Sequence, residues 1–330
     1  MMLKANWLQW LRLPSKLSQQ GVLGMNQRNH SYIGRYNDRS LYPLVDNKLK
    51  TKQIALQAGA KVPELIGVIH NQAEVRQLKK LIPETSGFVI KPAQGSGGKG
   101  IMVITHQEGG RFFKPSGAEV SSADLERHVS NILAGLFSLG GKNDVALIES
   151  LIEFDDRLLK FSYEGVPDIR VVVFHGFPVM AMMRCSTAAS DGKANLHQGA
   201  VGVGLDIASG RAVNAVQFDH PIRHHPDTQA DLSALQVDNW TELLQLASSA
   251  WEMTRLGYVG TDIVLDKTRG PMILELNARP GLAIQIANAC GLLPRLNYIE
   301  QQLESGKLNA LSLQERVSFS QQLFQREACF

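Results

Sequence analysis

The chain has few cysteines and little net charge. Among its 330 residues the cysteines are Cys185, Cys290 and Cys329, which lack the C-x-x-C spacing of a zinc site or a redox pair. Three thiols cannot build a disulfide framework, so we expect a reducing compartment and predict the cytoplasm. The formal net charge is +3. This is too small for a protein whose main role is to coat nucleic acid, so no nucleic-acid partner is expected.

The chain also lacks long apolar runs. No stretch approaches the roughly 18 uninterrupted apolar residues of a membrane span, and the apolar run near the start is too short for a signal peptide. What is present is 44% hydrophobic and 20% charged residues. These proportions are typical of a globular protein and exclude disorder for most of the chain. At about 150 residues per domain, the length suggests two domains.

The beginning of the chain differs in charge from the rest. Residues 1–45 hold six Lys and Arg residues against Asp38 alone, together with Trp7 and Trp10. A basic arm that carries tryptophan is suited to a membrane surface or an acidic protein partner. The favoured alternative is an arm that folds over its own domain.

Local patterns predict both helices and strands. Helices are expected over 48–57, 71–81, 121–140 and 239–256, and strands over 63–70, 88–92, 101–105, 145–152, 169–174 and 179–183. A β-hairpin is expected over 258–277, followed by helices. Strands and helices that mix without strict alternation favour an α+β fold.

A glycine-rich turn occupies residues 94–100, with Gly95, Gly97, Gly98 and Gly100. Glycines allow backbone N–H groups to approach and wrap a phosphate. The G-x-G-x-x-G match is not a dinucleotide fingerprint, because a strand rather than a helix is expected next. It is not a Walker A loop either, since Gly follows Lys99.

The turn is therefore expected at the tip of a hairpin that can close over a triphosphate. Protein kinases use such a hairpin, but the chain contains neither H-R-D nor D-F-G. Lys91 lies in the preceding strand, where a charge is unfavourable unless it meets an anion. A flexible surface hairpin without a ligand remains the alternative.

The second candidate site lies in the hairpin 258–277. If Asp266 faces Pro271, Asp262 lies opposite Glu275, and Asn277 and Arg279 follow Glu275 on the same face. At ~4 Å and an effective dielectric constant near 20, the two carboxylates would repel by about 4 kcal/mol. A divalent cation removes this cost, and two carboxylates with an amide oxygen suit magnesium. Relief by Arg279 or by lysines is the alternative.

Taken in order, these motifs resemble the α-L-glutamate ligase-like (RimK-type) branch of the ATP-grasp superfamily, from about Asp46 to Glu304. The resemblance is carried by 46–48, 89–91, 94–100, 148–152, 168–170, 195–199, Asp262 and 275–281. It implies two α+β subdomains that clasp the nucleotide, after a shortened N-terminal region. The implied boundaries are 1–45 for the basic arm, 46–148 for the subdomain with the glycine-rich loop, 149–310 for the subdomain with the metal site, and 311–330 for a tail.

The resemblance also implies a nucleotide site. Lys48 and Lys91 would hold the α- and β-phosphates, and Asp168 would contact the nucleotide. Adenine would lie against the backbone of a hinge, with Glu149 as its side-chain contact. The implied loop residues are Gly95, Ser96, Gly97, Gly98 and Gly100, and the implied hinge residues are Glu149, Ser150, Leu151 and Ile152.

A reaction centre is implied as well. Two Mg²⁺ ions, with Mn²⁺ as a substitute, would be held by Asp262, Glu275 and Asn277. Arg170 would lie near the transferring phosphate. The acyl-phosphate and its tetrahedral successor would be stabilised by Arg279, Lys193 and Asn195.

The implied activity is ADP-forming carboxylate–amine ligation, with glutamate or another amino acid as a substrate and a small molecule or peptide as its partner. About 45 residues precede Lys48, fewer than the family usually has, so part of the acceptor pocket is missing, rebuilt or supplied by a partner. A regulatory ATP-binding module without ligase activity is the alternative function, and a phosphotransferase is a third.

Overall fold

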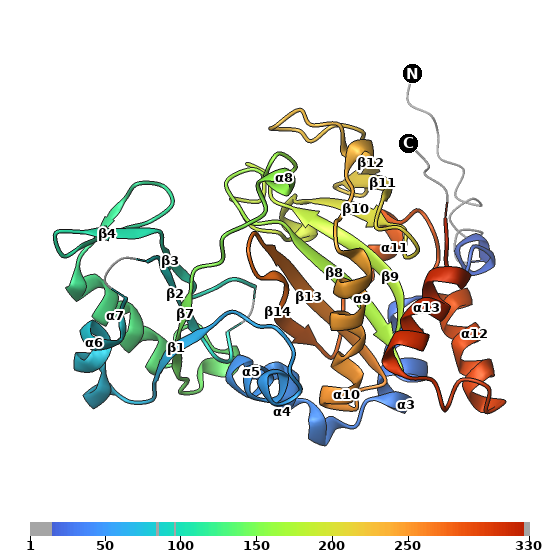
Figure 1. The fold of residues 1–330 in the computed structure, drawn as a ribbon, viewed down its shortest axis with the longest axis horizontal. Helices are drawn as coiled ribbons and strands as arrows, with labels where there is room; N and C mark the ends of the chain where they lie inside the picture. Colours follow the sequence, from blue (N-terminus) through green and yellow to red (C-terminus); the bar gives the residue numbers. More distant parts are fainter. Residues whose placement is uncertain (1–14, 84–85, 96, 327–330) are drawn as a thin grey trace. The chain divides into compact units, whose positions relative to one another are not determined.

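A computed structural model describes residues 15–326 except 84, 85 and 96. The described chain forms two compact units (Figure 1). Unit 1 contains the residues up to Leu41, then Asp156–Val264, and the chain from Leu276 onward. Unit 2 contains Tyr42–Asp155 and Leu265–Glu275. The changes of unit near residues 42 and 156 lie close to the predicted boundaries at 46 and 149, which remain predictions.

Unit 1 is built on most of a seven-stranded sheet. Its strands are β8 (Asp168–Phe174), β9 (Phe177–Cys185), β10 (Val201–Leu205), β11 (Ala212–Gln217), β12 (His220–Pro221), most of β13 (Tyr258–Asp266) and the end of β14 (Gly270–Asn277). Its helices are α2 (Met25–Gln27), a π-helix (Arg28–Ile33), α3 (Gly34–Tyr36), α8 (Asp156–Leu159), α9 (Trp240–Ser248), α10 (Ala250–Thr254), α11 (Ile284–Ala287), α12 (Leu293–Glu304) and α13 (Leu313–Leu323). Short 3-10 turns span Arg39–Leu41, Leu196–Gln198 and Leu232–Ala234.

The sheet has the strand order β12-β11-β10-β9-β8-β13-β14. β8 pairs antiparallel with both β9 and β13. The hydroxyl of Thr261 on β13 donates to the carbonyl of Ala247 on α9, so α9 covers the face to which Thr261 points. Side chains alternate along a strand, and Asp262 therefore points to the other face. α9 therefore lies on one face of the sheet, while the opposite face carries the charged residues and is packed by α11 along β10.

The described part of the N-terminal region packs on unit 1. The side-chain amide of Asn37, which is buried, donates to the carbonyls of Tyr258 and Ala278 and accepts from the N–H of Tyr258. Arg28 donates to the carbonyl of Pro280. From residue 15 onward the arm thus folds over its own unit, as the favoured interpretation expects. Its two tryptophans lie outside the described residues.

Unit 2 contains two smaller sheets. Its strands are β1 (Leu65–Ile69), β2 (Phe88–Pro92), β3 (Met102–Ile104), β4 (His106–Glu108), β5 (Arg111–Phe113), β6 (Glu119–Val120) and β7 (Ala146–Ser150). Its helices are α4 (Pro43–Asp46), α5 (Lys48–Gln57), α6 (Leu78–Leu81) and α7 (Ser122–Leu133), with 3-10 turns at Gln72–Gln77 and Leu139–Gly141. The sheet orders are β1-β7-β2-β3 and β4-β5-β6.

The core of unit 2 lies between its four-stranded sheet and α7. Phe88 and Ile90 of β2 and Leu125 and Ile132 of α7 are fully buried in one cluster. α7 begins with the expected capping box, in which Ser121 and Asp124 bond each other's backbone N–H. This packing fixes β2, the strand that carries Lys91 into the candidate site.

The prediction of an α+β fold is confirmed, with local differences. The helix over 48–57 is confirmed as predicted. The segment 71–81 is a 3-10 turn followed by a short helix, and the helix expected over 239–256 divides at Ser249. Strands β10 and β11 were not predicted, because their glycines and small residues weaken the alternating pattern.

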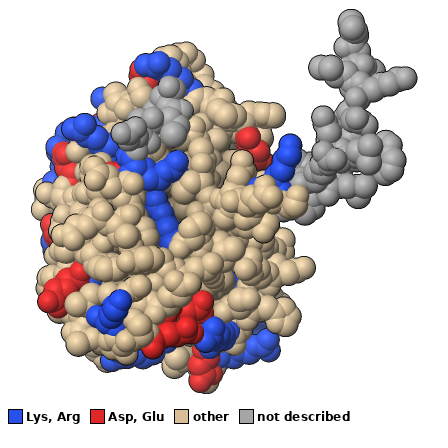
Figure 2. Space-filling model, turned by 90° about the vertical axis from the view of Figure 1, so that its right-hand side faces the viewer, with Lys and Arg blue, Asp and Glu red and all other residues tan. Residues whose placement is uncertain are grey.

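The face of unit 1 that carries α12 and α13 is shown in Figure 2. Lys and Arg side chains gather toward the upper part of that face and acidic side chains toward its lower edge, with uncharged residues over most of the rest (Figure 2). Charges of both signs therefore share this face. Within the described residues, no helix is long and apolar enough to cross a membrane.

Candidate active site

Strand register places four charged residues together on one face of the unit 1 sheet. Asp168 lies opposite Arg184 in the β8–β9 pair, and Arg170 lies opposite Asp262 in the β8–β13 pair. Residues two apart on a strand share a face, so Asp168 and Arg170 bring both pairs to the same side. On this face, each aspartate lies beside an arginine of the neighbouring strand.

The four side chains are bound to one another. Arg170 uses Nε and Nη2 to donate to the two carboxylate oxygens of Asp262, at 2.7 and 2.6 Å. Arg184 makes the same two-pronged contact with Asp168 and also donates from Nη2 to Asp262 Oδ2 at 2.9 Å. The amide of Asn277 donates to the same Oδ2 at 3.2 Å. We call Asp168, Arg170, Arg184 and Asp262 the arginine–aspartate network.

The network fixes the ionisation of its members. Burial by itself opposes the charged form of Asp262, but the guanidinium groups of Arg170 and Arg184 outweigh burial and hold the pKa of this carboxyl well below its ordinary value. Burial likewise disfavours the charged form of Arg184, and Asp168 with Asp262 raises its pKa above the ordinary value. Burial raises the pKa of Asp168, with Arg184 opposing the shift, and its two hydrogen bonds from Arg184 fit a carboxylate. As ion pairs, the network therefore sets two guanidinium groups against two carboxylates.

The predicted magnesium ligands suit a hard cation by donor chemistry, since Asp262 and Glu275 supply carboxylate oxygens and Asn277 an amide oxygen. Among the described residues, no group of three or more His, Cys, Asp or Glu side chains is arranged to hold a metal ion. An ion here would therefore need amide, water or phosphate oxygens in addition. It would also have to compete with the arginine N–H groups for the oxygens of Asp262.

Unit 2 gathers lysines around one carboxylate. Glu149 on β7 is 3% exposed, and its two oxygens lie 3.0 Å from Lys52 Nζ and 2.7 Å from Lys91 Nζ. Lys52 also donates to the carbonyl of Pro63. The sequence assigned the Glu149 side chain to adenine, whereas the structure places it between two buried lysines. We call Lys52, Lys91 and Glu149 the lysine cluster.

The cluster also shifts pKa values. Desolvation lowers the pKa of Lys52, with Glu149 opposing and Lys91 adding to the shift. Burial alone would raise the pKa of Glu149, but Lys91 and Lys52 overcome it and lower the pKa. Two cations against one anion leave this buried group with net positive charge. Such a group is suited to an additional anion.

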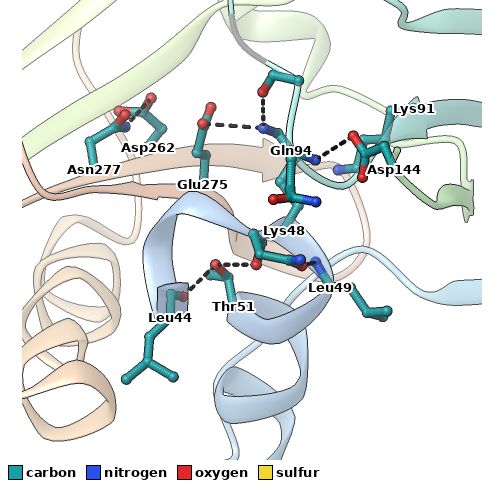
Figure 3. A network of polar contacts seen from close by, with 12 residues as sticks. Leu44, Lys48, Leu49, Thr51, Lys91, Gln94, Asp144, Asp262, Glu275 and Asn277 are labelled. Atoms are coloured by element: carbon teal, nitrogen blue, oxygen red, sulfur yellow. Dashed lines mark hydrogen bonds and ion pairs between the residues drawn. The ribbon is translucent and has the colours of Figure 1, made fainter. Parts of the chain in front are cut away.

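Lys48 begins α5 and connects the loop to the end of β14. Its Nζ donates to the carbonyl of Gly95 at 2.7 Å and to Glu275 Oε1 at 3.3 Å (Figure 3). Asn47 caps the helix by accepting from the N–H groups of Leu49 and Lys50. The cap fixes the first turn of α5, so the ammonium group is directed to the glycine-rich loop.

The base of the glycine-rich loop is fixed by Asp144. Its Oδ2 accepts from the N–H of Gln94 at 2.9 Å (Figure 3). The same oxygen accepts from the hydroxyl of Ser138 at 2.8 Å. A Cβ at Gly95 would come within 2.3 Å of the Pro92 ring. The loop is therefore anchored at Gln94, and no larger residue fits at Gly95.

The far end of the loop is also constrained. Gly100 has φ of +76°, and a Cβ there would lie 2.5 Å from the Phe137 ring. His128 on α7 contacts the Gly100 carbonyl at 2.9 Å. Between the two ends, Gly97 and Gly98 have positive φ and open space around them. Ser96 lies outside the described residues.

The predicted hinge follows β7. The backbone N–H groups of Ser150 and Leu151 already donate to backbone carbonyls. Arg269 donates to the Ser150 hydroxyl at 3.3 Å and to the Leu151 carbonyl at 3.4 Å. The backbone donors of two of the four predicted hinge residues are therefore already used within the protein.

The remaining predicted residues lie in loops of unit 1. Lys193 pairs with Asp191 at 2.9 Å, and both are exposed. Asn195 accepts from the N–H of His197 and caps the turn that follows. Arg279 is exposed just beyond β14. Asn195 therefore orders its loop in this structure, and the contact of Lys193 is a surface ion pair.

The sequence reasoning missed Arg184, Lys52 and Asp144. Arg184 was detectable, because it is a charge in an apolar strand, the same signal that identified Lys91. Lys52 lies one helical turn after Lys48 and thus on the same face of α5. Asp144 carried no comparable signal, since an acidic residue before a strand is common in loops.

Three solved structures resemble this chain to different degrees. D-cycloserine synthetase DcsG aligns with a TM-score of 0.50 and 15% identity over 81% of this chain and 73% of that one. The ATP-grasp ligase PsnB, in complex with a phosphomimetic variant of its minimal precursor, Mg and ADP, gives 0.44 and 15% over 81% and 62%. D-alanine–D-alanine ligase from Bacillus anthracis complexed with ATP gives 0.41 and 12% over 86% and 69%.

These likenesses concern the fold, and this chain spans less than two thirds of PsnB. A search of curated proteins found no match. A family model described as sugar-transfer associated ATP-grasp matches residues 27–301, most of the chain. The predicted ATP-grasp fold is confirmed, while the matching model does not name the RimK-type branch. The chain belongs to the sugar-transfer associated ATP-grasp family.

Proposed function

We propose that the protein is an ATP-dependent ligase that joins a carboxylate to an amine and releases ADP and phosphate. The observation that supports this proposal best is the concentration of lysines at the glycine-rich loop. Lys48 donates to the loop itself, and the lysine cluster beside it holds two cations against Glu149. Buried positive charge next to a glycine-rich loop suits the phosphates of a nucleotide.

In the proposed nucleotide site, Lys48 and Lys91 hold the α- and β-phosphates. Gly97 and Gly98, which have room around them, form the part of the loop that closes over the β- and γ-phosphates. Glu149 acts as the counter-ion of Lys91 rather than as a contact to adenine. Adenine then lies against the hinge backbone at Ile152.

In the proposed reaction, the γ-phosphoryl group of ATP transfers to a substrate carboxylate oxygen and ADP leaves. The amine then attacks the acyl carbon, the phosphate leaves, and the amine loses a proton. Arg170 and Arg279 would stabilise negative charge on the phosphate and on the tetrahedral intermediate. Lys193 and Asn195 would reach the site from their loop.

Two Mg²⁺ ions, with Mn²⁺ as a substitute, would be held by Asp262, Glu275 and Asn277, and would neutralise charge on the transferring group. Asp168 would contact the nucleotide through Arg184, the residue it binds. From the RimK-type resemblance we propose an amino acid such as glutamate as one substrate, with a small molecule or peptide as the other.

The test is ADP release with a panel of carboxylates and amines, together with ATP binding by calorimetry. We expect Lys91→Gln to weaken ATP binding at least about tenfold, because it removes a charge-assisted contact to phosphate. Lys79→Gln, an exposed lysine on α6, is the matched control. Undiminished ATP affinity in Lys91→Gln would contradict the proposed site.

The second candidate is a regulatory ATP-binding module. It is favoured by the commitment of both Asp262 oxygens to arginines. ATP binding without ADP release across the panel would support this module. An amide product that disappears in Glu275→Ala would eliminate it.

A further inference from the structure

Both oxygens of Asp262 accept hydrogen bonds from arginine. Oδ1 accepts one N–H, from Arg170, and Oδ2 accepts three, from Arg170, Arg184 and Asn277. Asp262 is 4% exposed. A cation at Oδ2 must replace an arginine or amide contact, and a cation at Oδ1, whose second lone pair these contacts do not use, must lie beside the Arg170 N–H.

Charge opposes such a cation as well. The arginine–aspartate network holds two positive and two negative side chains, so it has no net negative charge to attract a divalent ion. A guanidinium about 5 Å from the ion would repel it in a medium of low dielectric constant. The network therefore resists the metal that its aspartate is otherwise suited to bind.

The two arginines differ in how firmly they are held. Arg184 is tied to Asp168 by two hydrogen bonds in addition to its contact with Asp262. Within the part of the chain that the structure describes, Arg170 donates two hydrogen bonds, and both go to Asp262. Release of Asp262 thus leaves Arg184 in place on Asp168, whereas Arg170 must find another anion.

We infer that Arg170 and Asp262 form an exchangeable lock, in which Arg170 withholds Asp262 from a divalent cation until a phosphate of the nucleotide accepts the guanidinium. This inference rests on the proposed function. The exchange turns one ion pair into two, Arg170 with phosphate and Asp262 with the cation. Metal and nucleotide accordingly bind together, and the metal alone binds weakly. Arg184 is a positioning residue that keeps Asp262 in place throughout.

The test measures Mn²⁺ binding to the full-length protein without nucleotide, from the electron paramagnetic resonance signal of free Mn²⁺. We expect weak binding by the wild type and binding at least about tenfold tighter by Arg170→Gln, since removal of one charge near the ion changes its affinity by more than 1.4 kcal/mol. Unchanged or weaker binding in Arg170→Gln would overturn the lock.

Two further variants fix the interpretation. Arg170→Gln combined with Asp262→Asn is expected to lose the gain, because the released carboxylate is its source; a retained gain would contradict the lock. Arg223→Gln, which removes an exposed arginine from its pair with Asp231, is the matched control and is expected to bind Mn²⁺ as the wild type does.

Arg170→Lys is a second route if the glutamine variant folds poorly. Lysine keeps the charge but cannot contact both oxygens of Asp262, so we expect a smaller gain, and no gain would count against the lock. In the wild type, an unhydrolysable ATP analogue should tighten Mn²⁺ binding, and it should do so less in Arg170→Gln. If the wild type binds no nucleotide, the proposed function fails while the Mn²⁺ gain in Arg170→Gln still stands.

Discussion

The two units differ in the net charge of the side chains that they bury together. In unit 1, each aspartate of the arginine–aspartate network is matched by an arginine, and the group is neutral. In unit 2, the lysine cluster sets Lys52 and Lys91 against Glu149 alone and is positive. A positive buried group attracts an anion directly. A neutral group can only exchange partners. The lysine cluster is therefore suited to hold phosphate, and the arginine–aspartate network is suited to respond to it.

The two groups also differ in how the loss of one acidic residue affects stability. Each lysine of the cluster depends on Glu149 as its acidic partner, whereas each arginine of the network touches Asp262 and Arg184 touches Asp168 as well. Loss of Glu149 leaves two buried cations facing each other. Loss of either aspartate from the network leaves Arg184 in contact with the other.

The largest effect is expected from Glu149→Gln. Removal of one partner of a buried ion pair costs about 3–5 kcal/mol, and here two lysines lose their partner. Urea denaturation at pH 7 measures the loss. Glu119→Gln, whose pair with Arg111 is exposed, is the control and should change stability by at most about 1 kcal/mol. Similar losses of unfolding free energy in both variants would contradict the expected difference between a buried and an exposed ion pair.

An intermediate effect is expected from pH on unit 1. Burial lowers the pKa of His175 to about 4. In the unfolded chain this imidazole has its ordinary pKa near 6.5 and binds a proton before the folded protein does. Stability that is present above pH 6.5 is therefore lost as the pH falls toward 4. The loss from this group is up to about 3 kcal/mol.

The matched variant is His175→Asn, because the residue has φ of +47° and asparagine tolerates that conformation without a titrating group. Denaturation at pH 7, 5 and 4 should show a smaller loss in the variant than in the wild type. The pKa of Asp262 lies well below this window, so this carboxyl group does not contribute to the loss. Equal losses in the two proteins would show that His175 is not the sensitive group.

The smallest effect is expected from Asp168→Asn. Arg184 keeps its contact with Asp262, and asparagine can still accept one hydrogen bond, so the cost should be about 1–2 kcal/mol. Asp191→Asn, in an exposed pair with Lys193, should be nearly neutral. A cost for Asp168→Asn as large as that for Glu149→Gln would mean that the network does not share its charges as described.

Sequence patterns predicted the parts of the site that depend on local order. Lys48 at the start of a capped helix, the glycines of the loop and the hairpin with Asp262 follow from spacing along one segment. The partner of Asp262 could not be predicted in this way. Arg170 and Arg184 reach it through strand pairings between segments up to about 90 residues apart, and no local pattern specifies such a register.

Glu149 shows the same limit. The family resemblance implied a contact of its side chain to adenine, which stays a prediction, and α5 and β2 bring Lys52 and Lys91 to its carboxylate. An ionised side chain in a buried strand takes the strongest counter-ions within reach, and which counter-ions are within reach depends on packing. The sequence by itself therefore determined which segments carry chemistry, because helix caps, turns and alternation are local. Only the tertiary structure decided which charge meets which, because long-range strand pairing and burial choose the partners.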